Sequence, residues 1–206
     1  TTDSDDMEGS VTASADASGV DREQVEAALE GFTGTFTQRA PLFSAVRVDG
    51  VRAYRSARRG ESPDMPLRSV TVGDWSVGRM EDGRIRLRAR VSPGTYVRAL
   101  ARDIGSALGV GGAADRIVRE RTGCFTLEDC SNTPDDPRSF LSMPDAVKGY
   151  PSVTLSPEDR RRVGHGQPVP GEGDGVVMLL SEDGKLLAAG RAGGGRIRPE
   201  CVLEAL

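Results

Sequence analysis

The side chains best suited to chemistry lie close together at residues 92–98, in the string SPGTYVR. The phenol of Tyr96 and the guanidinium of Arg98 come directly after a Pro-Gly turn that closes an expected strand. A strand that turns into a helix brings side chains and backbone N–H groups together at one edge of a fold. Tyr96 could stack on a base or exchange a proton, and Arg98 could hold a carboxylate or a phosphate. The residues alone equally allow a helix-packing ring and a surface charge.

Arginine supplies all the basic charge around this string. Residues 31–125 carry seventeen arginines against nine acidic residues, a net charge of +8, whereas residues 1–30 carry −8. In 84–91, RIRLRARV, arginines alternate with apolar residues, so a strand would place four guanidiniums in one row about 7 Å apart. Such a row could follow the phosphates of a polyanion. The alternative is a solvated strand face paired with acids on neighbouring strands.

Several classes of protein do not fit the composition. The three cysteines show no CxxC spacing and the chain has one histidine, His165, so we expect no disulfide scaffold, no structural zinc site and no His-rich metal centre. No apolar run is long enough to span a bilayer. We expect a protein of the reducing cytoplasm without a membrane partner.

Helical and strand periodicities give a coarse map of the elements that must position the string. Residues 1–20 read as a loop or a frayed end. We expect helices and strands in the following places: helices at 21–29, 95–108 (capped by Thr95) and 113–121; a hairpin of strands 69–77 and 84–91; and short strands at 175–180, 185–190 and 196–203.

Four ordered blocks resemble one family. Residues 94–105, GTYVRALARDIG, resemble the GTYIRsLarDlG motif of the TruB-type tRNA pseudouridine synthases. Residues 32–54 resemble that family's FxGxxxQxPPxySAvKvnGxrAY, and 117–129 resemble LRRtrvGpFxledA. Segments 166–169 and 196–203 resemble its C-terminal domain, which is similar to PUA RNA-binding modules.

The resemblance implies an α+β fold with a mixed, largely antiparallel sheet flanked by helices. Residues 1–150 would form the C-terminal part of the catalytic domain, and 151–206 a small all-β PUA-like domain. It also implies isomerisation of the T-loop uridine at position 55 of tRNA to pseudouridine, with no metal or organic cofactor. By the matching motif, Arg98 would pair with a catalytic aspartate, Tyr96 would lie against the flipped base, and Ile117 would pack the apolar wall of the pocket. We expect RNA contacts from seven arginines: Arg47, Arg52, Arg55, Arg86, Arg88, Arg119 and Arg121.

The sequence departs from the family at the nucleophile. The family's aspartate lies in a GxLDxxAxG loop, and that string does not occur in these 206 residues. The opening residues 1–9 resemble TdTgDaeG, a stretch that follows the loop in the family. We therefore expect the C-terminal two-thirds of such an enzyme, inactive alone, monomeric, and binding tRNA without an obligatory protein partner. The alternatives are a non-catalytic tRNA-binding module or RNA-folding factor, and a guide-RNA-dependent uridine isomerase.

Overall fold

The computed structural model describes all residues except 132, 134, 136–139 and 204–206. The chain divides into two compact units, Thr1–Ile117 and Val118–Leu206. The predicted boundary between a catalytic and a PUA-like domain at residue 150 stays a prediction. The α+β class is confirmed, because helices flank mainly antiparallel sheets in the described residues.

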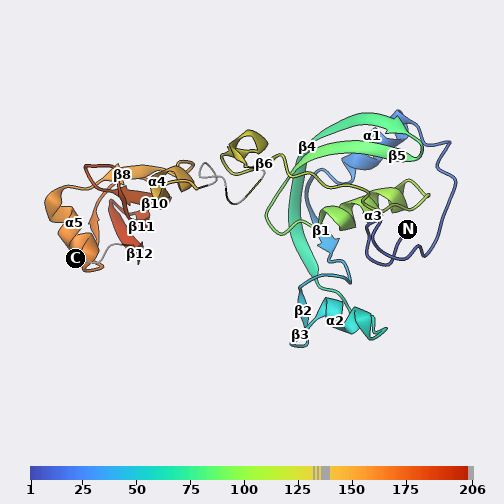
Figure 1. The fold of residues 1–206 in the computed structure, drawn as a ribbon, viewed down its shortest axis with the longest axis horizontal. Coiled ribbons are helices and arrows are strands. Elements are labelled where there is room, and N and C mark those ends of the chain that lie inside the picture. The colour runs from blue at the N-terminus through green and yellow to red at the C-terminus, as the bar shows by residue number, and fades with distance from the viewer. Residues whose placement is uncertain (132, 134, 136–139, 204–206) are drawn as a thin grey trace. The chain divides into compact units, whose positions relative to one another are not determined.

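Unit 1 holds residues 92–98, the expected junction of a strand and a helix. In chain order its elements are α1 (Arg22–Glu30), β1 (Gly34–Arg39), β2 (Arg47–Val48), β3 (Val51–Arg52), α2 (Ala53–Arg58), β4 (Leu67–Glu81), β5 (Arg84–Val91) and α3 (Val97–Ala107). The order β1-β4-β5 makes an antiparallel sheet, in which β4 is the middle strand. Figure 1 shows the long, curved β4–β5 hairpin wrapping around α1 and α3.

The alternation of exposed and half-buried residues along β5 explains which face of the β4–β5 hairpin packs on the helices. Along β5 the apolar residues are half-buried and the arginines are exposed, as the alternation predicts. The buried face packs on α1 and α3 in one apolar cluster. Its fully buried members are Val25, Leu29, Val72, Leu100 and Ile104. At roughly 1.5–3 kcal/mol for each large apolar side chain, this cluster holds the sheet to the two helices.

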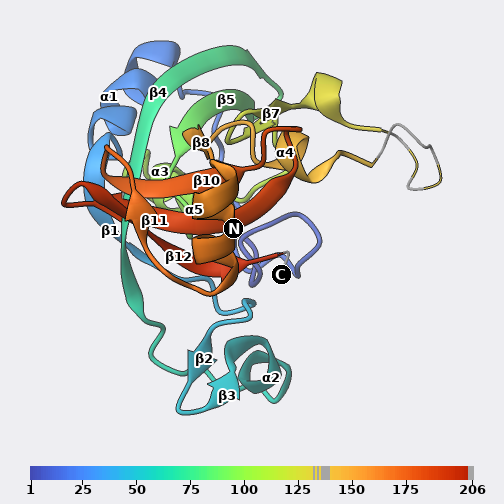
Figure 2. The same cartoon turned by 90° about the vertical axis from the view of Figure 1, so that its left-hand side faces the viewer.

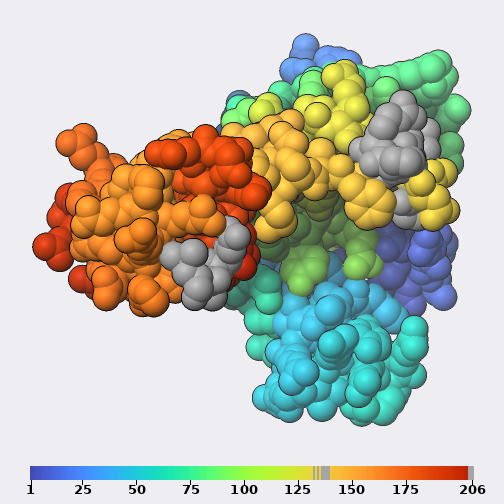
Figure 3. Space-filling model, turned by 60° about the vertical axis from the view of Figure 1, so that its left-hand side comes forward, coloured from blue at the N-terminus to red at the C-terminus, as the bar shows by residue number. Residues whose placement is uncertain are grey.

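A second, smaller cluster carries the module β2–β3–α2. Asp49 and Gly50 form the turn between the two short strands, both with positive φ, as the Asp-Gly pair predicts. Ala53 and Val46 are buried beneath the module together with Ala40 and Met65. The module forms a separate lobe of unit 1, coloured cyan in Figure 3.

Unit 2 ends in a β-rich fold. Its elements are β6 (Arg121–Thr122), β7 (Phe125–Thr126), the 3₁₀ helix η1 (Leu127–Asp129), α4 (Met143–Ala146), β8 (Ser152–Thr154), α5 (Pro157–Gly164), β9 (Val169–Pro170), β10 (Gly175–Leu180), β11 (Leu186–Gly193) and β12 (Arg196–Val202). Five strands form a sheet in the order β8-β10-β11-β12-β9. Figure 2 shows α5 lying across this sheet, where Val163 joins the buried cluster around Leu179 and Ile197.

Candidate active site

The predicted strand–turn–helix junction is present in unit 1. Strand β5 ends at Val91, Gly94 takes a positive φ of 85°, and α3 begins at Val97. The predicted cap at Thr95 is wrong. Tyr96 is the N-cap residue, and its side chain makes no capping hydrogen bond. The Thr95 hydroxyl instead donates to the Ser92 carbonyl (2.8 Å), which stabilises the turn before the helix.

A buried glutamine fixes the backbone of Tyr96. Gln38 of β1 is 1% exposed. Its Oε1 accepts from the Tyr96 N–H (2.9 Å) and its Nε2 donates to the Tyr96 carbonyl (3.1 Å). A buried amide in a strand is stable when its polar atoms are paired in this way. We did not single out Gln38 from the sequence, although a polar residue at an inward position of the 32–54 motif was a usable signal.

Arg98 lies at the centre of the site. Its Nη1 donates to the Ser4 carbonyl (2.9 Å) and to Asp6 Oδ2 (2.8 Å). Its Nη2 donates to the Phe43 carbonyl (2.8 Å). The side chains of Arg98 and Asp6 are 26% and 22% exposed, so water screens the pair less than a surface pair.

These bonds leave one edge of the guanidinium available. A guanidinium has five N–H donors, and among the described residues three of those of Arg98 are engaged. The Nε–H and one N–H of Nη2 have no acceptor among those residues, and Nε and Nη2 lie along one edge of the planar guanidinium. That edge has the geometry that binds a carboxylate through two parallel hydrogen bonds. Arg98 can therefore accept a second carboxylate while it keeps Asp6.

The carboxylate of Asp6 is held in its charged form. The Ser4 hydroxyl donates to Asp6 Oδ1 (2.6 Å), as does the Glu8 backbone N–H (3.1 Å). The Ser4 hydrogen bond, followed by those from Glu8 and Arg98, lowers the pKa of Asp6 below its usual value despite burial. Asp6 is therefore a permanent negative partner for Arg98 near neutral pH.

A second ion pair lies one helical turn further along α3. Arg102 Nη1 donates to Asp5 Oδ2 (2.9 Å), its Nε donates to Asp103 Oδ1 (2.8 Å), and its Nη2 donates to the Arg39 carbonyl (3.1 Å). Burial raises the pKa of Asp5, and the pairing with Arg102 opposes this rise. Burial disfavours the charge on Arg102, but Asp103 and Asp5 outweigh it and raise the pKa of the guanidinium.

The first dozen residues are an ordered part of the site. The Asp5 carbonyl accepts from the Ala114 N–H (2.9 Å), and the Met7 N–H donates to the Ala114 carbonyl (3.0 Å). We expected residues 1–20 to form either a loop or a frayed end. The first dozen of them form an anchored loop, so a frayed end is wrong for these residues. The predicted helix at 113–121 is also wrong, because Ala114 makes a β-bridge with Asp6 in place of helical hydrogen bonds. We did not single out Asp5 and Asp6 as site residues.

Two parts of the chain match models of the same protein family. Residues 1–97 match the TruB family pseudouridylate synthase N-terminal domain, and residues 151–203 match the C-terminal model of pseudouridine synthase II TruB. The tRNA pseudouridine synthase B of Synechococcus sp. (strain CC9311) is 36% identical over 218 residues, which cover 99% of this chain and 73% of that protein. The chain belongs to the TruB family of pseudouridine synthases.

Other relatives agree with this membership. The tRNA pseudouridine synthase B of Corynebacterium efficiens is 39% identical over 91% of this chain and 66% of that protein. Among solved structures, a Cbf5-Nop10-Gar1 complex contains a chain with a TM-score of 0.67 and 25% identity, over 90% of this chain and 63% of that one. A further match, an H/ACA RNP bound to a substrate RNA, has a TM-score of 0.65 and 21% identity and shows the fold alone. The chain thus spans about two-thirds to three-quarters of the length of its relatives.

In this TruB-family chain Tyr96 and Arg98 both lie at the start of α3, and their predicted catalytic roles stay predictions. The Tyr96 ring is half-buried against the cluster beneath the β2–β3–α2 module, and the Arg68 guanidinium lies 5.9 Å from the ring centroid. Ile117, the third predicted site residue, is 52% exposed. Its role in the pocket stays a prediction.

The seven predicted RNA-binding arginines are all exposed. Arg47, Arg52 and Arg55 lie on the β2–β3–α2 module, and Arg86 and Arg88 lie on β5. At the ends of the β5 row, Arg84 pairs with Asp115 (3.1 Å) and Arg90 with Asp74 (3.0 Å). The alternative of acids on neighbouring strands therefore holds for Arg90, whose partner lies in β4, whereas Asp115 lies outside the strands. Arg119 and Arg121 belong to unit 2, where Arg121 Nε donates to the Gly123 carbonyl (2.8 Å).

No metal centre is visible in the described part of the chain, where no three His, Cys, Asp or Glu side chains gather as ligands. None of the described helices is long and apolar enough to cross a bilayer.

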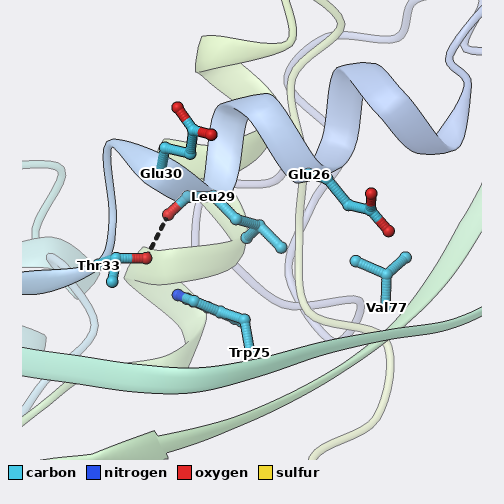
Figure 4. A pocket seen from close by; sticks show the side chains of 6 residues that line it. All are labelled: Glu26, Leu29, Glu30, Thr33, Trp75 and Val77. Carbon is cyan, nitrogen blue, oxygen red and sulfur yellow. Dashed lines mark hydrogen bonds between the residues drawn. The ribbon is translucent and has the colours of Figure 1, made fainter.

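A hollow of about 240 Å³ lies elsewhere in unit 1, between α1 and β4. It is lined by Glu26, Leu29, Glu30, Thr33, Trp75 and Val77. Figure 4 shows the carboxylate of Glu30 pointing away from the Trp75 ring, so the polar groups do not converge on one point. Trp75 packs in the main cluster and its Nε1 donates to the Phe32 carbonyl (3.3 Å), so its ring has a packing role.

Proposed function

We propose that this chain is part of a tRNA pseudouridine synthase that isomerises the T-loop uridine at position 55. This part binds the RNA and supplies Arg98, which orients the catalytic aspartate. The observation that carries the proposal is the open Nε/Nη2 edge of Arg98, next to Tyr96, in a chain of the TruB family. This edge is the place where a catalytic carboxylate would be held. A low-dielectric pocket strengthens such a pair and orients the nucleophile.

The resemblance gives the chemistry that the site would serve. An aspartate attacks the nucleoside, the glycosidic bond breaks, the uracil turns, and a bond forms between C5 and C1′. Arg98 would orient that aspartate, and Tyr96 would lie against the flipped base and help to exchange the C5 proton. The uridine must leave its stack to reach them. The aspartate loop of the family does not occur in these 206 residues, so we propose that it is supplied by sequence outside them.

The exposed arginines support tRNA as the partner. Three of them lie on the β2–β3–α2 lobe, and this module joins the cluster against which Tyr96 packs. This lobe, which carries the arginines, lies next to the Tyr96 ring. Its arginines could bind the phosphates of the T-stem of tRNA while the T-loop enters the site. We propose that the protein acts as a monomer in the cytoplasm, without an obligatory protein partner or a cofactor.

Pseudouridine mapping on a T-stem-loop RNA tests the proposal. The 206-residue chain should bind the RNA but form no pseudouridine, whereas the parent protein that carries the aspartate loop should modify one uridine. A stem-loop with cytidine at that position is the control and should stay unmodified. Isomerisation by the 206 residues alone would show that the nucleophile lies within them. Binding without isomerisation by the parent would favour the non-catalytic module.

A further inference from the structure

Two consecutive acids face two arginines in the candidate active site. Arg98 and Arg102 are four residues apart on α3, so they project from the same face of the helix. Asp6 pairs with Arg98 and Asp5 pairs with Arg102. Asp5 also lies within electrostatic range of Arg98, which acts on its pKa. Two carboxylates are therefore near enough to compete for Arg98, and the fold assigns only one of them to it.

Asp5 is strongly held in its present place. Its side chain is 12% exposed and its backbone takes a positive φ of 63°, which few residues other than glycine adopt. Apart from the Arg102 ion pair, its carbonyl accepts from the Ala114 N–H. A buried carboxylate that loses its cation is left uncompensated and is drawn to the nearest other cation. For Asp5 that cation is Arg98.

Arg102 is bound at three points, which fixes its guanidinium. Besides Asp5 it contacts the Asp103 carboxylate on its own helix and the Arg39 carbonyl at the end of β1. These hydrogen bonds connect the Arg102 side chain both to β1 and to its own helix, α3.

We propose that Arg102 is a positioning residue that sequesters Asp5 and so keeps the Nε/Nη2 edge of Arg98 open for the catalytic carboxylate. Without Arg102, the Asp5 carboxylate would occupy that edge and block it. The inference rests on the proposed function for its catalytic consequence, but the arrangement of charges can be measured in the 206-residue chain itself.

Hydrogen exchange of the Arg98 Nε–H, followed by ¹⁵N NMR and assigned by its loss in Arg98→Lys, tests the sequestration. In the unsubstituted chain this proton has no acceptor among the described residues and should exchange quickly. In Arg102→Met it should exchange at least about tenfold more slowly, because Asp5 becomes its acceptor. Adding Asp5→Asn, which tolerates the positive φ and removes the charge, should restore fast exchange.

The catalytic consequence is measured in the parent protein. Arg102→Met should lower kcat on the T-stem-loop RNA about tenfold or more with little change in KM, and the added Asp5→Asn should recover most of the loss. A role limited to stability would give losses that add rather than reverse. Arg79→Met, which removes an exposed guanidinium paired with Glu81 on β4, is the matched control and should leave both constants unchanged.

Three results would overturn the proposal. They are an unchanged Arg98 Nε–H exchange rate in Arg102→Met, a slowed rate that Asp5→Asn does not reverse, and a slowed rate in Asp5→Asn alone. If Arg102→Met does not fold, Arg102→Gln, which also removes the cation that pairs with Asp5, gives the same comparison, and no slowing there counts against the proposal. A parent protein that shows the exchange pattern but no isomerisation would remove the proposed function and leave the sequestration of Asp5 standing.

Discussion

The contact between Gln38 and Tyr96 gives the sharpest prediction for stability. Gln38→Met keeps the length of the side chain and removes both hydrogen bonds to the Tyr96 backbone. The Tyr96 carbonyl keeps a partner, since it also accepts from the Leu100 N–H (3.1 Å), but the Tyr96 N–H loses its acceptor. An orphaned buried donor costs about 1–3 kcal/mol, and the lost second bond to the carbonyl about 1 kcal/mol. We expect unit 1 to lose roughly 2–4 kcal/mol of unfolding free energy.

Urea unfolding followed by tryptophan fluorescence measures this loss in unit 1 alone, because Trp75 is the single tryptophan of the chain. With a slope of about 1–3 kcal/mol/M, the midpoint should fall by roughly 1–2 M. Gln24→Met is the matched control. Gln24 Oε1 makes an exposed hydrogen bond to the Asp21 N–H in the capping box of α1, so its loss should cost at most about 1 kcal/mol.

A Gln38→Met variant that loses no more than the Gln24→Met control would refute this reasoning. It would mean that water or a backbone shift satisfies the Tyr96 N–H at no cost. In the parent protein, the same variant should also lower kcat, since Tyr96 would no longer be fixed at the N-terminus of α3.

Arg98→Ala in the parent protein should lower kcat far more than tRNA affinity, because its open edge serves a carboxylate rather than a phosphate; equal losses in single-turnover rate and binding would contradict that assignment. Arg86→Ala or Arg88→Ala should do the opposite and reduce the salt dependence of RNA binding, measured by titration at several salt concentrations. An unchanged slope would return the β5 row to a solvated face. The lowered pKa of Asp6 stabilises the folded state above its ordinary value of 3.8, and this contribution is lost as the pH falls through the lower folded pKa. Asp6→Asn should therefore destabilise unit 1 at pH 7 and 5 in urea unfolding, and this loss should shrink as the pH falls below 3.8, whereas an equal loss at every pH would show that the charge is not responsible.

The local pattern of the sequence was sufficient for several elements. The alternation of arginine and apolar residues in 84–91 predicts a strand with one buried face, and that is how β5 lies on α1 and α3. Spacing also predicts α1 and α3 to within a few residues. It failed at 113–121, where residues suited to a helix are held instead by a β-bridge to Asp6. A contact between distant segments had overridden local preference there.

The sequence by itself determined the family of this protein, the strand–turn–helix junction and the position of Tyr96 and Arg98 at that junction, because these depend on neighbours in the chain. Only the tertiary structure decided what surrounds them. Asp6 and Arg98 are 92 positions apart, Asp5 and Arg102 are 97 apart, and Gln38 and Tyr96 are 58 apart. No periodicity connects such residues, and the acidic opening segment has the composition of a solvent-exposed tail. It becomes part of the site because folding brings it to a helix face where two arginines, partly shielded from water, pair with its carboxylates.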